Sequence, residues 1–105
     1  MAQMLIYVTA GSRDEALSLA RELVNSRLAA CANILTGTTS VYQWQGEVCE
    51  EEEVSLILKT RDDLVERLVE KVRELHSYDC PCVVSLPISS GNPAFLDWID
   101  SETVQ

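Results

Sequence analysis

Apolar residues recur along the chain with two periods, and the segments with a strand-like pattern predict a sheet. Residues 4–10 (MLIYVTA) and 82–88 (CVVSLPI) are short apolar runs, and residues 52–60 (EEVSLILKT) alternate between polar and apolar side chains. Such runs are typical of buried or half-buried strands. Since proline cannot donate a hydrogen bond to a neighbouring strand, Pro87 places the 82–88 strand at a sheet edge or marks its end.

A long hairpin is predicted in the middle of the chain. Residues 28–35 and 39–44 are expected to be extended, with an interruption at Gly37, and Gln45–Gly46 supplies a turn before the 52–60 strand. The four consecutive glutamates at 50–53 are expected to form a solvated turn that leads into this strand.

Two longer segments have helical periodicity and recognisable start signals. Ser12 with Glu15 forms a capping-box pattern, and apolar residues then recur at helical spacing to about residue 26. Thr60 with Asp63 suggests a second cap, followed by an apolar stripe that ends near His76.

A short third helix and the order of elements complete the predicted fold. Asn92 is a suitable N-cap, and Pro93 suits the first helical position. The order is β-α-β-β-α-β followed by a short C-terminal helix, which predicts an α+β, ferredoxin-like split βαβ sandwich. Residues 1–105 are expected to form a single domain of this type.

The predicted sheet carries apolar side chains on both faces, although two helices cover only one face. On the second face the pattern places Leu5, Tyr7, Leu35 and Ile57. An uncovered apolar face of this size exceeds the patches that monomers usually expose. We therefore expect the chain to associate with copies of itself.

Composition and charge exclude several classes of function. The chain has 105 residues, 47% of them hydrophobic, and a net charge of −9 from 8 basic and 17 acidic residues. An acidic surface repels phosphate backbones, so nucleic-acid binding is not expected.

No apolar run approaches about 18 residues and no basic segment precedes the first strand, so we expect neither a membrane span nor a signal peptide. A cytoplasmic location follows as the expectation. The acidic excess suits solubility, with cation binding at residues 50–53 as the alternative.

The only histidine lies close to two of the four cysteines, which raises the question of a metal site. His76, Cys80 and Cys82 fall within the stretch HSYDCPC. Structural zinc sites normally have four ligands, and the fourth is missing here. A disulfide between Cys80 and Cys82 is disfavoured by their spacing in an extended segment. The helix-end position of His76 offers a structural explanation, because an imidazole there can cap free carbonyls.

Five blocks of sequence together resemble the divalent-cation-tolerance CutA family. They are NSRLAACANI (25–34), SVYQWQGEV (40–48), LILKT (56–60), HSYDCP (76–81) and SLPISSGNPAFLDWI (85–99). The resemblance covers almost the whole chain, and the blocks are specific only in combination.

The resemblance implies a tight homotrimer of ferredoxin-like subunits, with hairpin strands that extend across subunit boundaries. It also implies a role in tolerance to copper and other divalent cations, with metal ion binding, no obligatory cofactor and no enzymatic activity. The architecture of the family is similar to that of the PII signalling proteins. A PII-like sensor of small ligands, or a signalling scaffold, is therefore the alternative function.

The resemblance also nominates site residues, each of which has a structural alternative. The clefts between subunits of the family are lined by residues that match Cys31, Tyr42, Trp44, Lys59, His76, Tyr78 and Trp98. The three aromatic rings Tyr42, Trp44 and Trp98 also suit core or interface anchors. Lys59 suits either an anionic ligand or a pairing with a carboxylate. The candidate metal ligands are His76, Cys31 and Cys82, although a cysteine among alanines is commonly a small buried apolar residue.

Three positions depart from the pattern of the resembled family. Its proposed copper ligands include a first-strand cysteine and a second histidine, where this chain has Val8 and Leu75. Its glutamate after the loop proline is replaced here by Cys82. A thiol in place of a carboxylate shifts metal preference towards softer ions. A third functional class, an enzyme with Cys31 or Cys82 as nucleophile and His76 as base, rests only on residue types.

Overall fold

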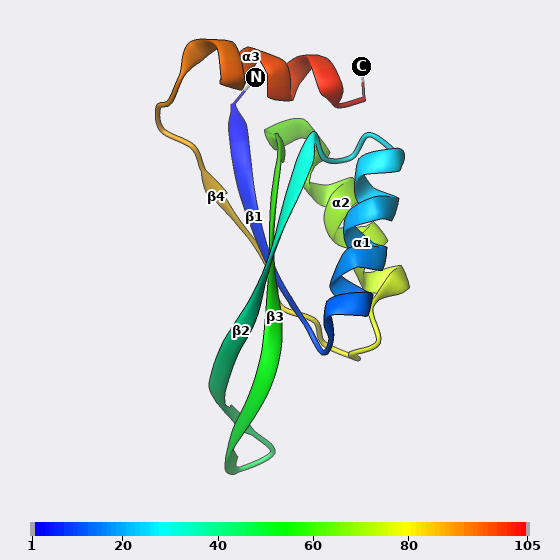
Figure 1. The fold of residues 1–105 in the computed structure, drawn as a ribbon, viewed down its shortest axis with the longest axis vertical. Coiled ribbons are helices and arrows are strands. Elements are labelled where there is room, and N and C mark those ends of the chain that lie inside the picture. The colour runs from blue at the N-terminus through cyan, green and yellow to red at the C-terminus, as the bar shows by residue number, and fades with distance from the viewer. Residues whose placement is uncertain (1, 105) are drawn as a thin grey trace.

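The computed structural model describes residues 2–104 and contains one four-stranded antiparallel sheet (Figure 1). Its strands are β1 (Gln3–Ala10), β2 (Cys31–Trp44), β3 (Glu47–Arg61) and β4 (Val83–Pro87). They lie in the order β2-β3-β1-β4, and every neighbouring pair is antiparallel. This is the predicted ferredoxin-like arrangement. β4 is an edge strand that ends at Pro87, as the proline indicated.

Helices cover one face of the sheet and one end of it. α1 (Arg13–Asn25) and α2 (Val65–Leu75) lie on the same face, and α3 (Pro93–Glu102) crosses the end of the sheet near the N-terminus (Figure 1). A short 3-10 turn, η1 (Asp62–Leu64), precedes α2. No helix within residues 2–104 is both long and apolar enough to cross a membrane.

The core lies between the sheet and the two helices α1 and α2. Alternating residues of β1 and β3 that face the helices are buried, as are the central residues of the helical stripes, whereas Val24 and Leu75 at the helix ends are exposed. Each such side chain contributes about 1.5–3 kcal/mol through removal from water. The largest of them are Ile6, Leu23, Leu56, Leu58 and Leu68.

Two of the three predicted helix starts are confirmed by their hydrogen bonds. The hydroxyl oxygen of Ser12 accepts a bond of 3.1 Å from the backbone N–H of Glu15. The side-chain oxygen of Asn92 accepts a bond of 3.2 Å from the N–H of Ala94, and Pro93 occupies the first helical position. Both residues satisfy backbone donors that a helix leaves free at its N-terminus.

The predicted cap of the second helix is wrong. Thr60 is still part of β3, and its buried hydroxyl donates to the carbonyl of Leu28 at 2.7 Å. Asp63 is instead bound by Arg61, whose Nε donates to Oδ1 at 3.0 Å. The helix begins after the 3-10 turn, with Leu64 at the N-cap and no side-chain cap. The capping pattern failed because both of its polar side chains have partners outside the helix start.

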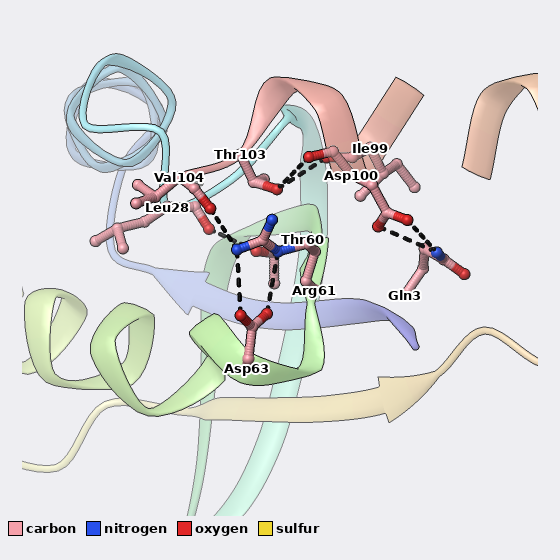
Figure 2. A network of polar contacts seen from close by, with 9 residues as sticks. All are labelled: Gln3, Leu28, Thr60, Arg61, Asp63, Ile99, Asp100, Thr103 and Val104. Atoms are coloured by element: carbon pink, nitrogen blue, oxygen red, sulfur yellow. Dashed lines mark hydrogen bonds and ion pairs between the residues drawn. The ribbon is translucent and has the colours of Figure 1, made fainter. Parts of the chain in front are cut away.

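Arg61 also anchors the C-terminal segment to the sheet (Figure 2). Its guanidinium donates to the carbonyl of Val104, while the N–H of Val104 donates to the carbonyl of Arg27 at 2.8 Å. The amide of Gln3 donates to both carboxylate oxygens of Asp100 at 3.1 Å. The last helix is therefore fixed over the end of the sheet by polar contacts to three earlier segments.

The predicted break at Gly37 is wrong, since β2 runs without interruption from Cys31 to Trp44. The register shifts between Leu35 and Thr38, and Gly37 has a φ of +84°. Glycine adopts this left-handed backbone without the penalty of a Cβ atom. A bulge thus absorbs the irregular residues and lets the strand continue.

The acidic run at 50–53 is also not a turn, because all four glutamates lie within β3. They pair with residues 38–41 of β2, and the connection of the hairpin lies further along, at Gln45 and Gly46. The resulting β2–β3 hairpin projects beyond the helices and gives the chain dimensions of 44 × 25 × 22 Å (Figure 1). The run is solvated, as expected, but on a strand.

The face of the sheet opposite α1 and α2 is apolar and partly open. Across the sheet, Leu5 pairs with Leu86 and Tyr7 with Val84. Leu35, Val84 and Leu86 are 47%, 51% and 50% exposed. The predicted apolar second face is therefore present, and we refer to it as the open face.

Candidate functional site

The most developed concave site lies where the β2–β3 hairpin approaches the segment that follows α2. This hollow, which we call the hairpin hollow, has a volume of about 580 Å³. No lysine, arginine or histidine side chain is among its lining residues. Its ionisable lining consists of carboxylates and thiols, besides tyrosine hydroxyls. The carboxylates are Glu51, Glu53 and Asp79, and the thiols are Cys49, Cys80 and Cys82.

Strand period explains why the hairpin side chains converge. Alternate residues of a strand point to the same face, so Cys49, Glu51 and Glu53 share one face of β3. The register places Tyr42 opposite Cys49 and Ser40 opposite Glu51 on β2, and these residues also line the hairpin hollow.

Two tyrosine hydroxyls hold the two hairpin carboxylates. Tyr42 donates to Oε1 of Glu51, and Tyr78 donates to Oε2 of Glu53 at 2.8 Å. The bond to Glu51 raises the pKa of Tyr42 to about 12. Burial, followed by the bond to Glu53, raises the pKa of Tyr78 above its ordinary value. Both phenols stay protonated at neutral pH and act as donors that orient the carboxylates.

Cys82 lies close to Glu53, the carboxylate that Tyr78 holds. Burial, and then the negative charge of Glu53, raises the pKa of the Cys82 thiol, while a hydrogen bond with Thr9 works in the opposite direction. At neutral pH the group is therefore a thiol. Its raised pKa disfavours a nucleophilic role, because the thiolate is the reactive form. A cation that binds the sulfur must first displace the proton.

His76 lies behind the hairpin hollow and does not line it. Its side chain is fully inaccessible. Nδ1 accepts a hydrogen bond of 3.0 Å from the N–H of Tyr78, and Nε2 lies 2.8 Å from the carbonyl oxygen of Thr9. A backbone N–H can only donate and a carbonyl can only accept, so this geometry requires the tautomer with its proton on Nε2.

Cys31 and Lys59 lie elsewhere on the open face. They pair with each other across β2 and β3, and the ammonium of Lys59 donates to the side-chain oxygen of Asn33. Cys82 precedes β4, at the opposite edge of the sheet. The register places Cys31 level with Leu86, near the other end of β4, and Cys31 does not line the hairpin hollow. Within one chain, Cys31 is therefore not expected to share an ion with Cys82.

Trp98 is also distant from the hairpin hollow. It lies on α3, 38% exposed, and its ring stacks on that of Phe95 with centroids 5.4 Å apart. Of the cleft residues named by resemblance, the single chain gathers Tyr42, Trp44 and Tyr78 at the hollow, together with Cys82. It does not bring Cys31, Lys59 or Trp98 there. Their roles at an interface stay predictions.

Of the ionisable side chains that line the hairpin hollow, the sequence analysis did not nominate Cys49 and Asp79. It weighed Cys80 only as part of a zinc set or a disulfide, and Glu51 and Glu53 only as part of a cation-binding run at residues 50–53. A usable signal was the alternation after Gly46, because a strand through residues 47–53 places Cys49, Glu51 and Glu53 on one face. Among residues 2–104, no three histidine, cysteine or acidic side chains are arranged to hold a metal ion. The metal roles of His76, Cys31 and Cys82 stay predictions.

Comparison with known proteins gives a consistent result. The divalent-cation tolerance protein CutA of Thermus thermophilus is 44% identical over 99 residues, which cover 94% of this chain and 96% of that protein. The chloroplastic CutA protein of Arabidopsis thaliana is 43% identical over 100 residues, which cover 95% of this chain and 55% of that protein. The crystal structure of CutA1 from Oryza sativa has a TM-score of 0.97 at 39% identity, covering 100% of this chain and 96% of that one.

The family match extends over nearly all of the fold. Residues 4–102, from β1 to the end of α3, match the family described as CutA1 divalent ion tolerance protein. This family is named for tolerance and not for a reaction. With a match of this length, and relatives above 40% identity, the chain belongs to the CutA1 divalent ion tolerance family.

Proposed function

We propose that this chain is a non-enzymatic protein of divalent cation tolerance that binds copper or another divalent cation at the hairpin hollow. The observation that carries the proposal is the lining of that site, where carboxylates and thiols meet without any basic side chain. Carboxylate oxygens and thiolate sulfurs are both metal ligands, and thiolates favour copper over harder ions. The names of the relatives refer to divalent cations in general.

The proposed functional unit is a homotrimer. In a single chain the described residues 2–104 provide no preformed set of three ligands, so a complete site requires side-chain rotation or residues of a neighbouring subunit. The exposed apolar side chains of the open face support such an assembly, since burial of Leu35, Val84 and Leu86 removes apolar area from water. In such a trimer, an open-face residue such as Cys31 of one subunit can reach the hairpin hollow of a neighbouring subunit.

The cysteines support a cytoplasmic location. All four are free in the structure, and Cys80 and Cys82 are exposed. Reducing compartments keep exposed thiols in this form. The alternative of a PII-like sensor for an anionic ligand has less support, because Lys59 bonds to Asn33 and does not line the hairpin hollow.

Titration calorimetry with Cu(I) and Cu(II) tests the proposal. The key variant is Glu51→Gln with Glu53→Gln, and the matched control is Glu50→Gln with Glu52→Gln, whose side chains leave the opposite face of the same strand. We expect affinity to fall by at least about tenfold in the first pair, roughly 1.4 kcal/mol, and to be unchanged in the second. Binding by the unmodified protein no tighter than about 10 µM would contradict the proposal.

A further inference from the structure

The segment 77–82 brings four side chains to the hairpin hollow without being part of a helix or strand. Tyr78, Asp79, Cys80 and Cys82 all line the site, and the segment lies between the end of α2 and the start of β4. Figure 1 shows this segment, in yellow, beside the turn from β1 into α1. Because no backbone ladder fixes it, its position depends on side-chain hydrogen bonds.

Besides the bond from Tyr78 to Glu53, the segment has two further attachments, and His76 supplies the first. Its ring joins the segment to β1, since Nδ1 accepts from the N–H of Tyr78 and Nε2 donates to the carbonyl of Thr9. The ring also contacts that of Tyr78, with centroids 4.6 Å apart.

Glu15 supplies the second attachment. Its carboxylate accepts bonds from the N–H of Ser77 at 2.8 Å and from the Ser77 hydroxyl at 3.0 Å. Glu15 is itself fixed at the start of α1, where its own N–H donates to Ser12. The segment is thus attached to two different elements through two adjacent residues.

This arrangement leaves His76 no free lone pair for a metal ion. In the neutral ring one nitrogen accepts and the other donates, and both roles are filled. A ligand role requires the ring to leave a fully inaccessible position and break the bond that fixes Tyr78. Loss of either bond leaves a buried polar group unpaired.

We propose that His76 is a positioning residue for the cation site and not a metal ligand: it acts through segment 77–82 by holding Tyr78 at the hairpin hollow. The cation-binding part of this inference rests on the function proposed above. The positioning part concerns the metal-free protein and is tested separately.

Amide hydrogen exchange of metal-free protein tests the positioning. Asparagine at position 76 can present its oxygen near the place of Nδ1, whereas glutamine can present its amide nitrogen near the place of Nε2. We expect the Tyr78 amide to exchange about tenfold faster in His76→Gln, as for the loss of a buried hydrogen bond, and within about threefold of the unmodified rate in His76→Asn. Glu22→Gln is the control. Like Glu15, Glu22 lies on α1, but it pairs with Lys71 at the surface. Unchanged exchange in His76→Gln would overturn the inference.

Pulsed EPR of the Cu(II)-loaded protein tests the ligand question. Since His76 is the only histidine, any imidazole nitrogen modulation has to come from it. We expect no such modulation in the unmodified protein, and the same copper spectrum in both variants. We expect the affinity for Cu(II) to fall about tenfold in His76→Gln but to stay within about threefold in His76→Asn. A purely structural role changes the unfolding temperature and leaves affinity in place.

The two failures are distinguishable. Imidazole modulation in the unmodified protein, or unaltered affinity in His76→Gln, would overturn the positioning role. Absence of copper binding would overturn the proposed function, and the exchange of the Tyr78 amide would then decide the positioning role by itself.

Discussion

The hydroxyl of Tyr78 donates a hydrogen bond of 2.8 Å to Oε2 of Glu53 and so joins the segment after α2 to the projecting hairpin. Burial and this bond raise the pKa of Tyr78, which keeps the phenol a donor at every physiological pH. The bond therefore links two parts of the chain that are 25 residues apart and orients a carboxylate towards the hairpin hollow.

Removal of the Tyr78 hydroxyl provides a first test of this link. We expect Tyr78→Phe to lower the free energy of unfolding by about 1–2 kcal/mol, because the bond is partly buried and its acceptor is charged. Tyr42→Phe is the matched control, since it removes the same kind of bond, to Glu51, at an exposed position. We expect a clearly smaller loss there, because solvent screens an exposed bond. Urea unfolding measures both, and equal losses would contradict the assigned difference in burial.

A second prediction concerns the pH dependence of the attachment at Glu15. Burial disfavours the charged carboxylate, but hydrogen bonds from Ser77 and from the N–H of Gly11 outweigh it and lower the pKa of Glu15 below 4.5. A lowered pKa in the folded chain stabilises it above the ordinary pKa, and this contribution disappears as pH falls through the folded value.

We therefore expect Glu15→Gln to be less stable than the unmodified protein by about 1.5 kcal/mol at pH 7, as for hydrogen bonds to a charged group. The difference should shrink as pH falls below about 4.5. Thermal unfolding between pH 3 and pH 7 measures it, with Glu22→Gln as the control. A difference that stays constant across this range would show that the charge of Glu15 is not involved.

The sequence predicted the order of elements because each core position follows from local periodicity. The alternation of Val54, Leu56 and Leu58 defines a strand wherever the rest of the chain lies. The predictions failed where a local pattern competes with a distant partner. Thr60 and Asp63 have the spacing of a cap, but Thr60 binds the carbonyl of Leu28, 32 residues away, which no local sequence window shows. Asp63 pairs with Arg61, a neighbour that the capping pattern does not take into account.

The candidate site was less predictable than the fold for the same reason. Tyr42, Trp44, Tyr78 and Cys82 were named through resemblance and do line one hollow. Glu51 and Glu53 were not singled out because the run of four glutamates was taken as a turn, and only its placement within β3 separates the two that face the site from Glu50 and Glu52. His76 was nominated from its residue type and through resemblance, whereas the bond of its Nε2 depends on Thr9 of β1, 67 residues away.

A third prediction follows from the raised pKa of Cys82. Since a bound cation displaces the thiol proton, affinity for Cu(I) should rise with pH between about 6 and 8, by up to about tenfold per unit. Cys82→Ser should remove this dependence and lower the affinity at pH 8 by at least about tenfold, because a hydroxyl is a poor ligand for a soft ion. Competition titrations with a Cu(I) chelator at several pH values measure both effects.

The control for this series is Cys31→Ser, in which the thiol lost lies on β2, at the opposite edge of the sheet. If ligands come from one chain, this variant keeps the pH dependence and the affinity. If Cys31 of a neighbouring subunit completes the site, affinity falls while the dependence due to Cys82 persists. If Cys82→Ser changes neither the affinity nor its pH dependence, this thiol is not a ligand. If the affinity falls but a pH dependence persists, Cys49 or Cys80 of the same hollow also contributes a thiolate.

The fourth prediction concerns the proposed trimer and compares two leucines of similar exposure. Leu86 is 50% exposed on the open face, whereas Leu75 is 44% exposed at the end of α2, where no further apolar surface is expected to be covered. If copies of the chain cover the open face, Leu86 becomes buried in the assembly, and a lysine there places a charge in an apolar contact. Such a burial costs several kcal/mol unless the charge is paired.

Light scattering of the unmodified protein should give a mass three times the 11.7 kDa of one chain. Leu86→Lys should shift this mass towards that of the single chain, and Leu75→Lys should not. If the unmodified protein has the mass of a single chain, the proposed trimer is wrong. If the two variants behave alike, the open face is not the trimer interface.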